Sequence, residues 1–374
     1  MSGRYEKRLV RGCGVILLFF AFWCETDCLL TSPRTNAMPD RFETACFSNL
    51  NDEYAAALET AAVFDISDRT RLQMTGPDAA SFLHRFCTNQ LQTLPAGLGC
   101  EAFLCNIKGR ILGHVFAFVG EAAVRIDTSP GQADALMSHL EKYHLLEDFR
   151  LEDVSSATFS FLVSGPRAAE TLVSTGIDAD QLQPIAWQVF GDVAVRRVDL
   201  FGVPGFLIDG PIESGDDVWS WLAGSGAVPA GREALTALRI EARFPQYPVD
   251  LSDDNLAQEA NRTAEAISFS KGCYLGQEPI ARLHAMGHVN RELVCVEIEP
   301  SADGAADQSA PTPGIVLLHP DKPDKQIGTL TSTAWSPGRR RAVGLGMLRS
   351  QFAKAGTEIP TADGGTVRVV ECRK

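Results

Sequence analysis

The strongest constraint on the fold is a local pattern that occurs twice along the chain. Residues 71–83 read RLQMTGPDAASFL, and residues 160–172 read SFLVSGPRAAETL. Each copy predicts a short apolar strand, a Gly-Pro turn and a helix, because proline in the first helical turn loses no needed N–H and glycine allows the tight bend before it. In the first copy Phe82, Leu83 and Phe86 share one helical face, which indicates packing against a sheet.

The segments after each helix continue the repeat. Residues 111–119 and 123–127 alternate like paired strands, and residues 193–199 and 205–209 do the same in the second copy. A further helix is predicted after each strand pair. The duplicated unit is therefore strand-helix-strand-strand-helix, and two such units can pair their sheets into a pseudo-symmetric α+β body.

The carboxyl-terminal part has a different pattern. From residue 290 onward short strands alternate with turns, which indicates a small antiparallel β-barrel. The predicted fold class is α+β, a duplicated body with a C-terminal barrel. We expect four parts: a leader or misassigned upstream segment at 1–48, the first half of the body at 49–155, the second half at 156–289, and the barrel at 290–374.

The amino-terminal residues carry the sequence signals for the cellular location of the protein. Residues 4–11 are basic and residues 12–24, GCGVILLFFAFWC, are apolar. The run is short for a membrane span and has the length of a signal-peptide core. Two interpretations stay open: export directed by residues 12–24, or translation that begins at Met38, which would leave residues 1–37 out of the mature protein. We expect a cytoplasmic protein, with export as the alternative, and no stable membrane insertion of the body.

Charge and cysteine content limit the classes of function. The formal charge is -13 over 374 residues. A sequence-independent grip on nucleic acid needs clustered Lys and Arg, so no direct nucleic-acid binding is expected. The ten cysteines contain no C-x-x-C pair, which favours reduced thiols over a disulfide framework or a zinc site.

Residues 268–288, SFSKGCYLGQEPIARLHAMGH, gather polar and titratable side chains at high density. Gly272 and Gly276 allow positive φ, so we expect a sharp turn that projects Cys273 outward. A free cysteine is also a small apolar residue that is often buried, and this alternative stays open. The segment is nevertheless the strongest candidate site in the chain.

Charged neighbours bear on the chemistry of this thiol. Lys271 and Arg282 are expected to lower the pKa of Cys273, because cations stabilise the thiolate, which is the nucleophilic and metal-binding form. Gln277 and Glu278 fit the first turn of a helix, where a carboxylate favours the positive end of the dipole. Glu278 can also orient Arg282 four residues later.

Three histidines are further candidate site residues. His284 and His288 have the i, i+4 spacing of metal ligands on a helix. Gly287 predicts that the helix has already ended, so a solvent or substrate-loop role is favoured and no metal is assigned. His114 lies on a predicted strand and is interpreted as an interior histidine with a hydrogen-bond partner.

Several motifs resemble the glycine-cleavage T-protein superfamily, the folate-binding aminomethyltransferases, over about residues 50–372. They are VFDIS (63–67), GPDAASFLHRFCTN (76–89), LRIEARFPQYPVD (238–250), KGCYLGQE (271–278) and IGTLTS (327–332). The stretch KGCYLGQEPIAR is similar to the YgfZ-type branch. That resemblance implies a folate-binding protein linked to the maintenance of iron-sulfur enzymes and, through them, to tRNA modification.

The chain departs from the transferase pattern at three places. Gly113 and His114 stand where the aminomethyltransferases carry an acidic pair, and Val203 stands where their glutamate holds the pterin ring. Pro248 replaces a glycine. Aminomethyl transfer needs a carboxylate that handles a proton or stabilises an iminium, so the first departure argues against that reaction.

The resemblance implies a function and a set of site residues. We expect a folate-binding accessory protein of iron-sulfur cluster assembly or repair, whose partners are iron-sulfur enzymes or assembly proteins. A folate-dependent aminomethyltransferase or demethylase and a scaffold without chemistry are the alternatives, so enzymatic activity stays open on a transferase-like fold. Cys273 is the expected catalytic thiol. Its supporting residues are Lys271, Gly272, Tyr274, Gly276, Gln277, Glu278 and Arg282. Tetrahydrofolate is expected in the middle of the body, with candidate contacts from Asn106, Lys108, Arg243 and Asp250.

Overall fold

The computed structural model describes residues 41–299 and 309–373. The described residues belong to one compact unit. The predicted leader therefore lies, up to residue 40, outside the described residues. In the ranges 41–299 and 309–373 no helix has both the length and the apolar character needed to cross a membrane.

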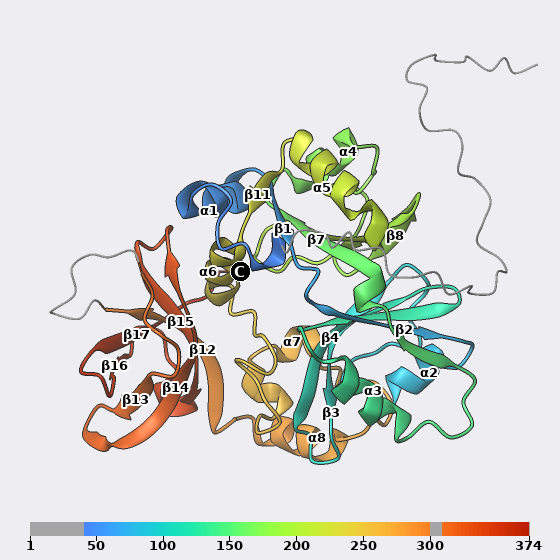
Figure 1. The fold of residues 1–374 in the computed structure, drawn as a ribbon. Coiled ribbons are helices and arrows are strands. Elements are labelled where there is room, and N and C mark those ends of the chain that lie inside the picture. Colours follow the sequence, from blue (N-terminus) through green and yellow to red (C-terminus); the bar gives the residue numbers. More distant parts are fainter. Residues whose placement is uncertain (1–40, 300–308, 374) are drawn as a thin grey trace, which may run out of the picture. The chain divides into compact units, whose positions relative to one another are not determined.

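Three sheets organise the unit (Figure 1). Their strand orders are β3-β4-β5-β2-β6, β11-β1-β7-β10-β9-β8 and β13-β14-β15-β12-β17-β16. The first has strands β2 (Thr70–Thr75), β3 (Gly99–Cys105), β4 (Ile111–Val119), β5 (Ala123–Thr128) and β6 (Arg150–Asp153). The second has β1 (Ala62–Asp65), β7 (Thr158–Ser164), β8 (Trp187–Phe190), β9 (Val193–Arg197), β10 (Gly205–Pro211) and β11 (Val228–Ala230). The third has β12 (Arg291–Ile298), β13 (Val316–His319), β14 (Lys322–Ser336), β15 (Arg341–Arg349), β16 (Glu358–Pro360) and β17 (Thr366–Val370).

Helices connect these strands. The α-helices are α1 (Leu50–Glu59), α2 (Ala79–His84), α3 (Ala133–Glu141), α4 (Ala168–Ser174), α5 (Gly215–Gly224), α6 (Arg232–Glu241), α7 (Thr263–Ala266) and α8 (Gln277–Met286). Short 3-10 turns lie at Arg41–Glu43, Ser155–Ala157, Ile212–Ser214, Ala257–Ala260 and Ser350–Phe352. The predicted α+β fold class is confirmed.

The two predicted strand-turn-helix segments are β2 with α2 and β7 with α4. Their glycines adopt the same backbone conformation, with φ of 139° at Gly76 and 140° at Gly165. A Cβ atom at Gly76 would clash with the carbonyl oxygen of Asp148, and one at Gly165 with the carbonyl oxygen of Thr60. Both copies of the repeat therefore require glycine for the same physical reason.

Strand β1 links the two copies. It comes early in the chain, yet it lies in the sheet of the second copy, antiparallel to β7 and parallel to β11. Val63 of β1 faces Val163 of β7 in the register. The amino-terminal segment that carries α1 and β1 is thus part of the sheet that the second copy builds.

The carboxyl-terminal strands form the predicted antiparallel barrel. Every strand pair in this sheet is antiparallel. An isolated bridge between Leu317 and Thr361 joins the two edges, so the barrel is nearly closed. Closure removes free sheet edges that would otherwise pair with other chains.

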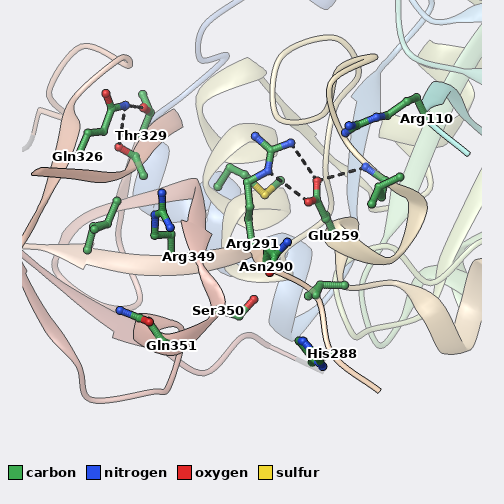
Figure 2. A pocket seen from close by; sticks show the side chains of 15 residues that line it. Arg110, Glu259, His288, Asn290, Arg291, Gln326, Thr329, Arg349, Ser350 and Gln351 are labelled. Atoms are coloured by element: carbon green, nitrogen blue, oxygen red, sulfur yellow. Dashed lines mark hydrogen bonds and ion pairs between the residues drawn. The ribbon is translucent and has the colours of Figure 1, made fainter. Parts of the chain in front are cut away.

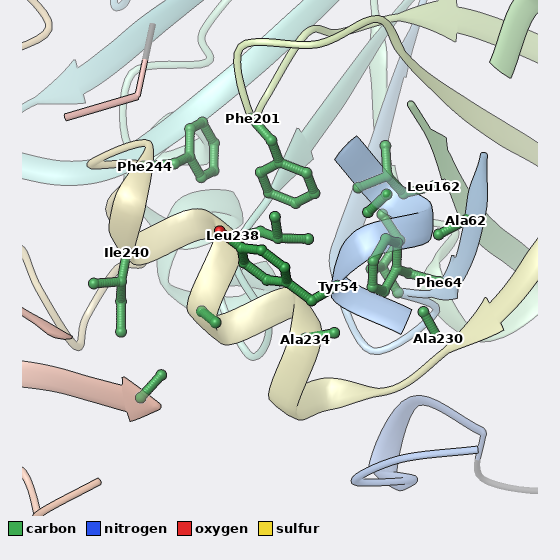
Figure 3. Close-up of a cluster of buried hydrophobic side chains, with 14 of the residues drawn as sticks. Tyr54, Ala62, Phe64, Leu162, Phe201, Ala230, Ala234, Leu238, Ile240 and Phe244 are labelled. Atoms are coloured by element: carbon green, nitrogen blue, oxygen red, sulfur yellow. The ribbon is translucent and has the colours of Figure 1, made fainter. Parts of the chain in front are cut away.

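Helix α6 sits at the centre of the largest apolar cluster (Figure 3). It contributes Ala234, Leu238 and Ile240, and the cluster also receives Tyr54 of α1 and Phe64 of β1. The same cluster contains residues of β4, β12 and β15. One helix therefore ties the body to the barrel by apolar burial, the dominant stabilising term in folding.

A buried ion pair lies on the inner side of the second sheet. Arg196 of β9 contacts Asp209 of β10, and the two side chains are 1% and 0% exposed. The Arg196 guanidinium also lies 5.2 Å from the ring centroid of Phe118, which belongs to β4 of the first sheet. The pair therefore places charge where the two sheets meet.

We expect Asp209→Ala to lower the free energy of unfolding by about 3–5 kcal/mol, because it leaves the Arg196 cation buried without its partner. The double variant R196M/D209L removes both charges and should recover most of that loss. Urea unfolding followed by tryptophan fluorescence measures both. Equal losses in the single and the double variant would contradict the assignment.

Candidate functional site

The KGCYLGQE loop is anchored by the buried side chain of Lys271. Its Nζ donates to the carbonyl oxygens of His84 at 2.6 Å, Cys87 at 2.7 Å and Asn89 at 2.9 Å. Burial lowers the pKa of this ammonium. Its nearest thiol contact is the buried Cys87 Sγ at 3.9 Å. The structure therefore assigns Lys271 to holding the loop on the segment after α2, which replaces the expected role in tuning Cys273.

Two more contacts fix the loop directly after the thiol. The Leu275 N–H donates to the Arg85 carbonyl at 2.8 Å. Tyr274 is buried in the cluster that also contains Phe103 and Ile280, and burial raises the pKa of its hydroxyl. The loop backbone is thus held from both ends.

The two loop glycines differ. Gly276 has φ of 81°, and a Cβ there would clash with the Asn106 carbonyl oxygen. Gly272 has no positive φ, and a Cβ there would meet open space. The predicted positive φ is therefore confirmed for Gly276 and wrong for Gly272. Only Gly276 lies against the 106–109 turn, so only this position requires glycine.

Cys273 is exposed at the tip of this loop. Of the seven cysteines in the described residues, it is the one whose side chain is exposed; Cys46 and Cys372 are half-buried, and the others are buried. The alternative of a buried thiol is therefore excluded. A solvent-accessible thiol on an anchored loop can meet a metal centre or a thiol on another molecule.

Helix α8 follows the loop and begins at Gln277, with Glu278 in its first turn as predicted. Glu278 and Arg282 are both exposed, and no ion pair joins them among the described residues. The predicted i, i+4 pair is therefore absent from this part of the chain. The helix ends at Met286 with Gly287 in the left-handed region, as the sequence indicated.

The two histidines of this segment have separate surroundings. The His284 ring stacks on Phe269, with centroids 3.7 Å apart. His288 lies beyond the helix end, and its Nδ1 is 3.1 Å from the Met286 carbonyl oxygen. Within residues 41–299 and 309–373 no group of three His, Cys, Asp or Glu side chains is arranged to hold a metal ion.

The 106–109 turn, with the sequence NIKG and hereafter the N-x-K-G turn, lies against Gly276 and is stabilised by its own asparagine. Asn106 Oδ1 accepts from the Lys108 N–H at 2.9 Å and from the Arg110 N–H at 3.2 Å. The Lys108 side chain is exposed. Asn106 therefore shapes the turn that receives the loop, and its assignment to folate stays a prediction.

A buried polar cluster occupies the inner face of β4. His114 Nε2 lies 2.7 Å from Glu101 Oε1, and Arg262 Nη2 donates to Glu101 Oε2 at 2.6 Å. The Arg262 guanidinium lies 5.3 Å from the Phe244 ring centroid. His114 is thus an interior histidine with a partner, as predicted, while Gly113 faces the other way, toward Leu136 of α3.

Sequence reasoning missed Glu101 and Arg262, the partners of His114. Glu101 is a lone carboxylate in the buried run of β3, and that position in an apolar strand was a usable signal. Burial alone would raise its pKa, but hydrogen bonds from Arg262 and His114 lower the pKa to about 2. Glu101 is therefore held ionised next to His114, one of the two residues that stand where the aminomethyltransferases carry an acidic pair.

Asp250 joins the body to the barrel. Its Oδ2 accepts from Arg239 Nη1 at 2.8 Å and from the Gln246 N–H at 2.9 Å, and its Oδ1 accepts from Thr331 and Ser332 hydroxyls at 2.6 Å each. Four donors occupy this buried carboxylate. Its expected contact with folate is therefore replaced by a structural role.

Arg243, the other expected folate contact, follows the end of α6. It adopts φ of 52°, and its Nη2 donates to the Asn261 carbonyl at 3.3 Å. Val203, which stands in place of the pterin-binding glutamate, packs on the central apolar cluster. Neither residue places a carboxylate in the middle of the body.

A small cavity of about 70 Å³ lies in the middle of the body, where folate was expected. Its lining includes Arg69, Arg239, Phe201 and Phe244. Ligand pockets measure roughly 300–1,000 Å³, so this conformation has space for water molecules and not for a folate. The lining residues offer aromatic rings and guanidinium groups, but the cavity is too small for folate.

The loop geometry predicts different effects for its two glycines. Gly276→Ala should lower the free energy of unfolding by more than about 1 kcal/mol, because φ is positive and the Asn106 carbonyl leaves no room. Gly272→Ala is the matched control and should change it by less than about 0.5 kcal/mol. Urea unfolding measures both, and equal effects would contradict the close approach described above.

The Glu101 cluster predicts an acid-sensitive contribution to stability. Because its folded pKa of about 2 lies below the ordinary value of 4.5, this contribution is present above pH 4.5 and is lost as the pH falls toward 2. Glu101→Gln should flatten the fall of the unfolding midpoint in that window. The exposed Glu265→Gln is the control and should leave the wild-type slope; the same slope in both variants would contradict the cluster.

Comparisons with known proteins agree with the architecture. Residues 28–271 match the GCVT N-terminal domain, and residues 291–373 match the glycine cleavage T-protein C-terminal barrel domain. An aminomethyltransferase from Lysinibacillus sphaericus is 27% identical over 84% of this chain and 85% of that protein. A chloroplastic Arabidopsis thaliana protein named "Putative transferase" is 26% identical over 85% of this chain and 72% of that protein.

A solved structure gives the same picture. The glycine cleavage system aminomethyltransferase T from Bartonella henselae superposes with a TM-score of 0.76 and 22% identity, over 87% of this chain and 91% of that chain. At this identity the likeness establishes the fold alone. The two family matches together cover the body and the barrel, and the chain therefore belongs to the glycine cleavage T-protein family.

Proposed function

We propose that this protein is a YgfZ-type folate-binding accessory factor of iron-sulfur cluster assembly or repair, which supports tRNA modification indirectly. The observation that carries the proposal is the exposed Cys273 on a loop whose remaining contacts hold it in place. In this role the thiolate binds transiently to an iron atom of a cluster that a partner protein carries. The cluster is the partner's cargo and not a resident cofactor.

The anchoring of the loop supports this role. Lys271 and Leu275 fix the backbone on the segment after α2, and Gly276 fixes it on the 106–109 turn. A thiol on such a loop keeps its position when a partner approaches, so little conformational entropy is lost on contact. The position thus favours repeated, short-lived encounters over burial in the protein's own core.

Folate binding, as part of the proposal, requires the central cavity to widen. Phe201 lies in the connection between β9 and β10, and Phe244 lies just after α6, so widening would displace these two rings and no strand. Both rings are buried in the central apolar cluster, so widening costs apolar burial. Arg69, Arg232 and Arg239 line the cavity, and each already pairs with a carboxylate, of Asp127, Asp68 and Asp250 respectively. A ligand that carries carboxylates would share these guanidinium groups. No chemical step is assigned to the folate.

A folate-dependent aminomethyltransferase is the second candidate. It is favoured by the aminomethyltransferase relatives and opposed by Gly113 and Val203, which put no carboxylate where that reaction uses one. Incubation of the purified protein with an aminomethyl donor and tetrahydrofolate discriminates the two. Release of methylenetetrahydrofolate would favour the transferase and demote the accessory role.

The thiol role predicts a loss of function for Cys273→Ser. Activities of cluster-containing enzymes in the host under oxidative stress should fall severalfold, because serine does not supply a thiolate ligand. Cys46→Ser changes a half-buried cysteine outside the loop and should leave those activities unchanged. Wild-type activities in the Cys273→Ser strain would sink the proposed role of the thiol.

Calorimetry with tetrahydrofolate tests the ligand separately. Binding is expected for the wild type and for Cys273→Ser, and it should be lost in Thr236→Phe, which fills the cavity from α6. Absence of binding in the wild type would refute the folate part and leave the thiol experiment unaffected.

A further inference from the structure

A cleft of about 1070 Å³ lies between the body and the barrel (Figure 2). The body contributes Arg110, after the N-x-K-G turn, and Glu259, in a 3-10 turn. The barrel contributes Arg291 of β12 and Arg349 at the end of β15. The cleft contains no residue of the KGCYLGQE loop and none of the central cavity.

The cleft carries an excess of positive charge in an acidic protein. Arg110, Arg291 and Arg349 line it, and Glu259 is the one carboxylate in its lining. These side chains give a formal charge of about +2, whereas the whole chain carries -13. Concave surfaces lined by one sign of charge concentrate ligands of the opposite sign.

The single carboxylate is already neutralised by the protein. Glu259 is buried, and its two oxygens accept from Arg291 Nε and Nη2 at 3.2 Å each and from the Leu256 N–H at 3.2 Å. Asn255 Nδ2 donates to the same carboxylate at 3.2 Å. Glu259 therefore positions Arg291 and has little capacity left to repel an anion.

The arginines are held in different ways. Arg110 donates to the Asp254 carbonyl, and Arg291 Nη2 donates to the same oxygen at 2.6 Å. Arg349 is exposed, and no ion pair of the described residues includes it. Figure 2 shows Arg349 on the barrel side, Arg110 on the body side and Arg291 between them. Positive groups therefore lie at separated points of one cleft.

A neutral polar group completes the lining. Ser350 Oγ is buried and has no hydrogen-bond partner in the described part of the chain, although the Ser350 N–H donates to the Asn290 carbonyl at 3.0 Å. A buried hydroxyl without a partner is destabilising.

We propose that this cleft binds a small polyanion, a molecule with at least two carboxylate or phosphate groups, one held by Arg349 on the barrel and another near Arg110 and Arg291 on the body. The concave shape between two walls and the volume suit a small molecule better than a macromolecular surface. This site goes beyond the proposed function and depends on neither the thiol nor folate.

The test is calorimetry of the full chain with two probes, citrate for carboxylates and tripolyphosphate for phosphates. At least one probe should bind, with an affinity that falls as salt is raised. Arg349→Ala should weaken that binding about 10-fold, the usual cost of one charge-assisted contact, and Arg349→Glu should weaken it further. The probe that binds more tightly identifies the anionic group.

Arg341→Ala provides the matched control. Arg341 is also an exposed arginine of β15, but it pairs with Glu299 and does not line the cleft. The affinity for the probe should be unchanged in this variant. Binding of neither probe at about 1 mM, or binding that Arg349→Ala and Arg341→Ala affect equally, would overturn the proposal.

Discussion

The buried carboxylate of Asp250 is the interaction on which the arrangement of body and barrel depends. It accepts from Arg239 of α6, from the backbone of the 246–250 loop and from Thr331 and Ser332 of β14. An ionised carboxylate is stable in the interior only when donors surround it. The cleft between body and barrel has defined walls because this joint, together with the apolar face of α6, fixes both sides.

The sequence predicted the elements that rest on local chemistry. The Gly-Pro turns of β2–α2 and β7–α4, the barrel strands, and the start and end of α8 all follow from residue types a few positions apart. It did not predict the side-chain partners of the site. Glu101 meets Arg262 and Lys271 meets His84 across more than 150 residues of chain, so no local pattern encodes these pairs.

The dependence on residues far apart in the sequence also explains the predictions that were wrong. Lys271 was expected to serve the adjacent thiol, but three carbonyl oxygens at and after the end of α2 offer an ammonium better coordination than an exposed loop tip does. Gly272 was expected to be conformationally special, yet the close approach of the 106–109 turn occurs only at Gly276. In both cases a distant segment decides what the local residue does. Asp250 lost its expected ligand role for the same reason.

The coordination of Lys271 also determines how the loop can be transplanted. The eight residues of KGCYLGQE do not orient the thiol by themselves. The carbonyl oxygens that accept from Lys271 and the 106–109 turn that meets Gly276 hold the loop in place. A graft of the loop alone onto another scaffold would therefore lose the direction of Cys273. The smallest portable unit is the loop together with these two segments, which are contributed by the other half of the repeat.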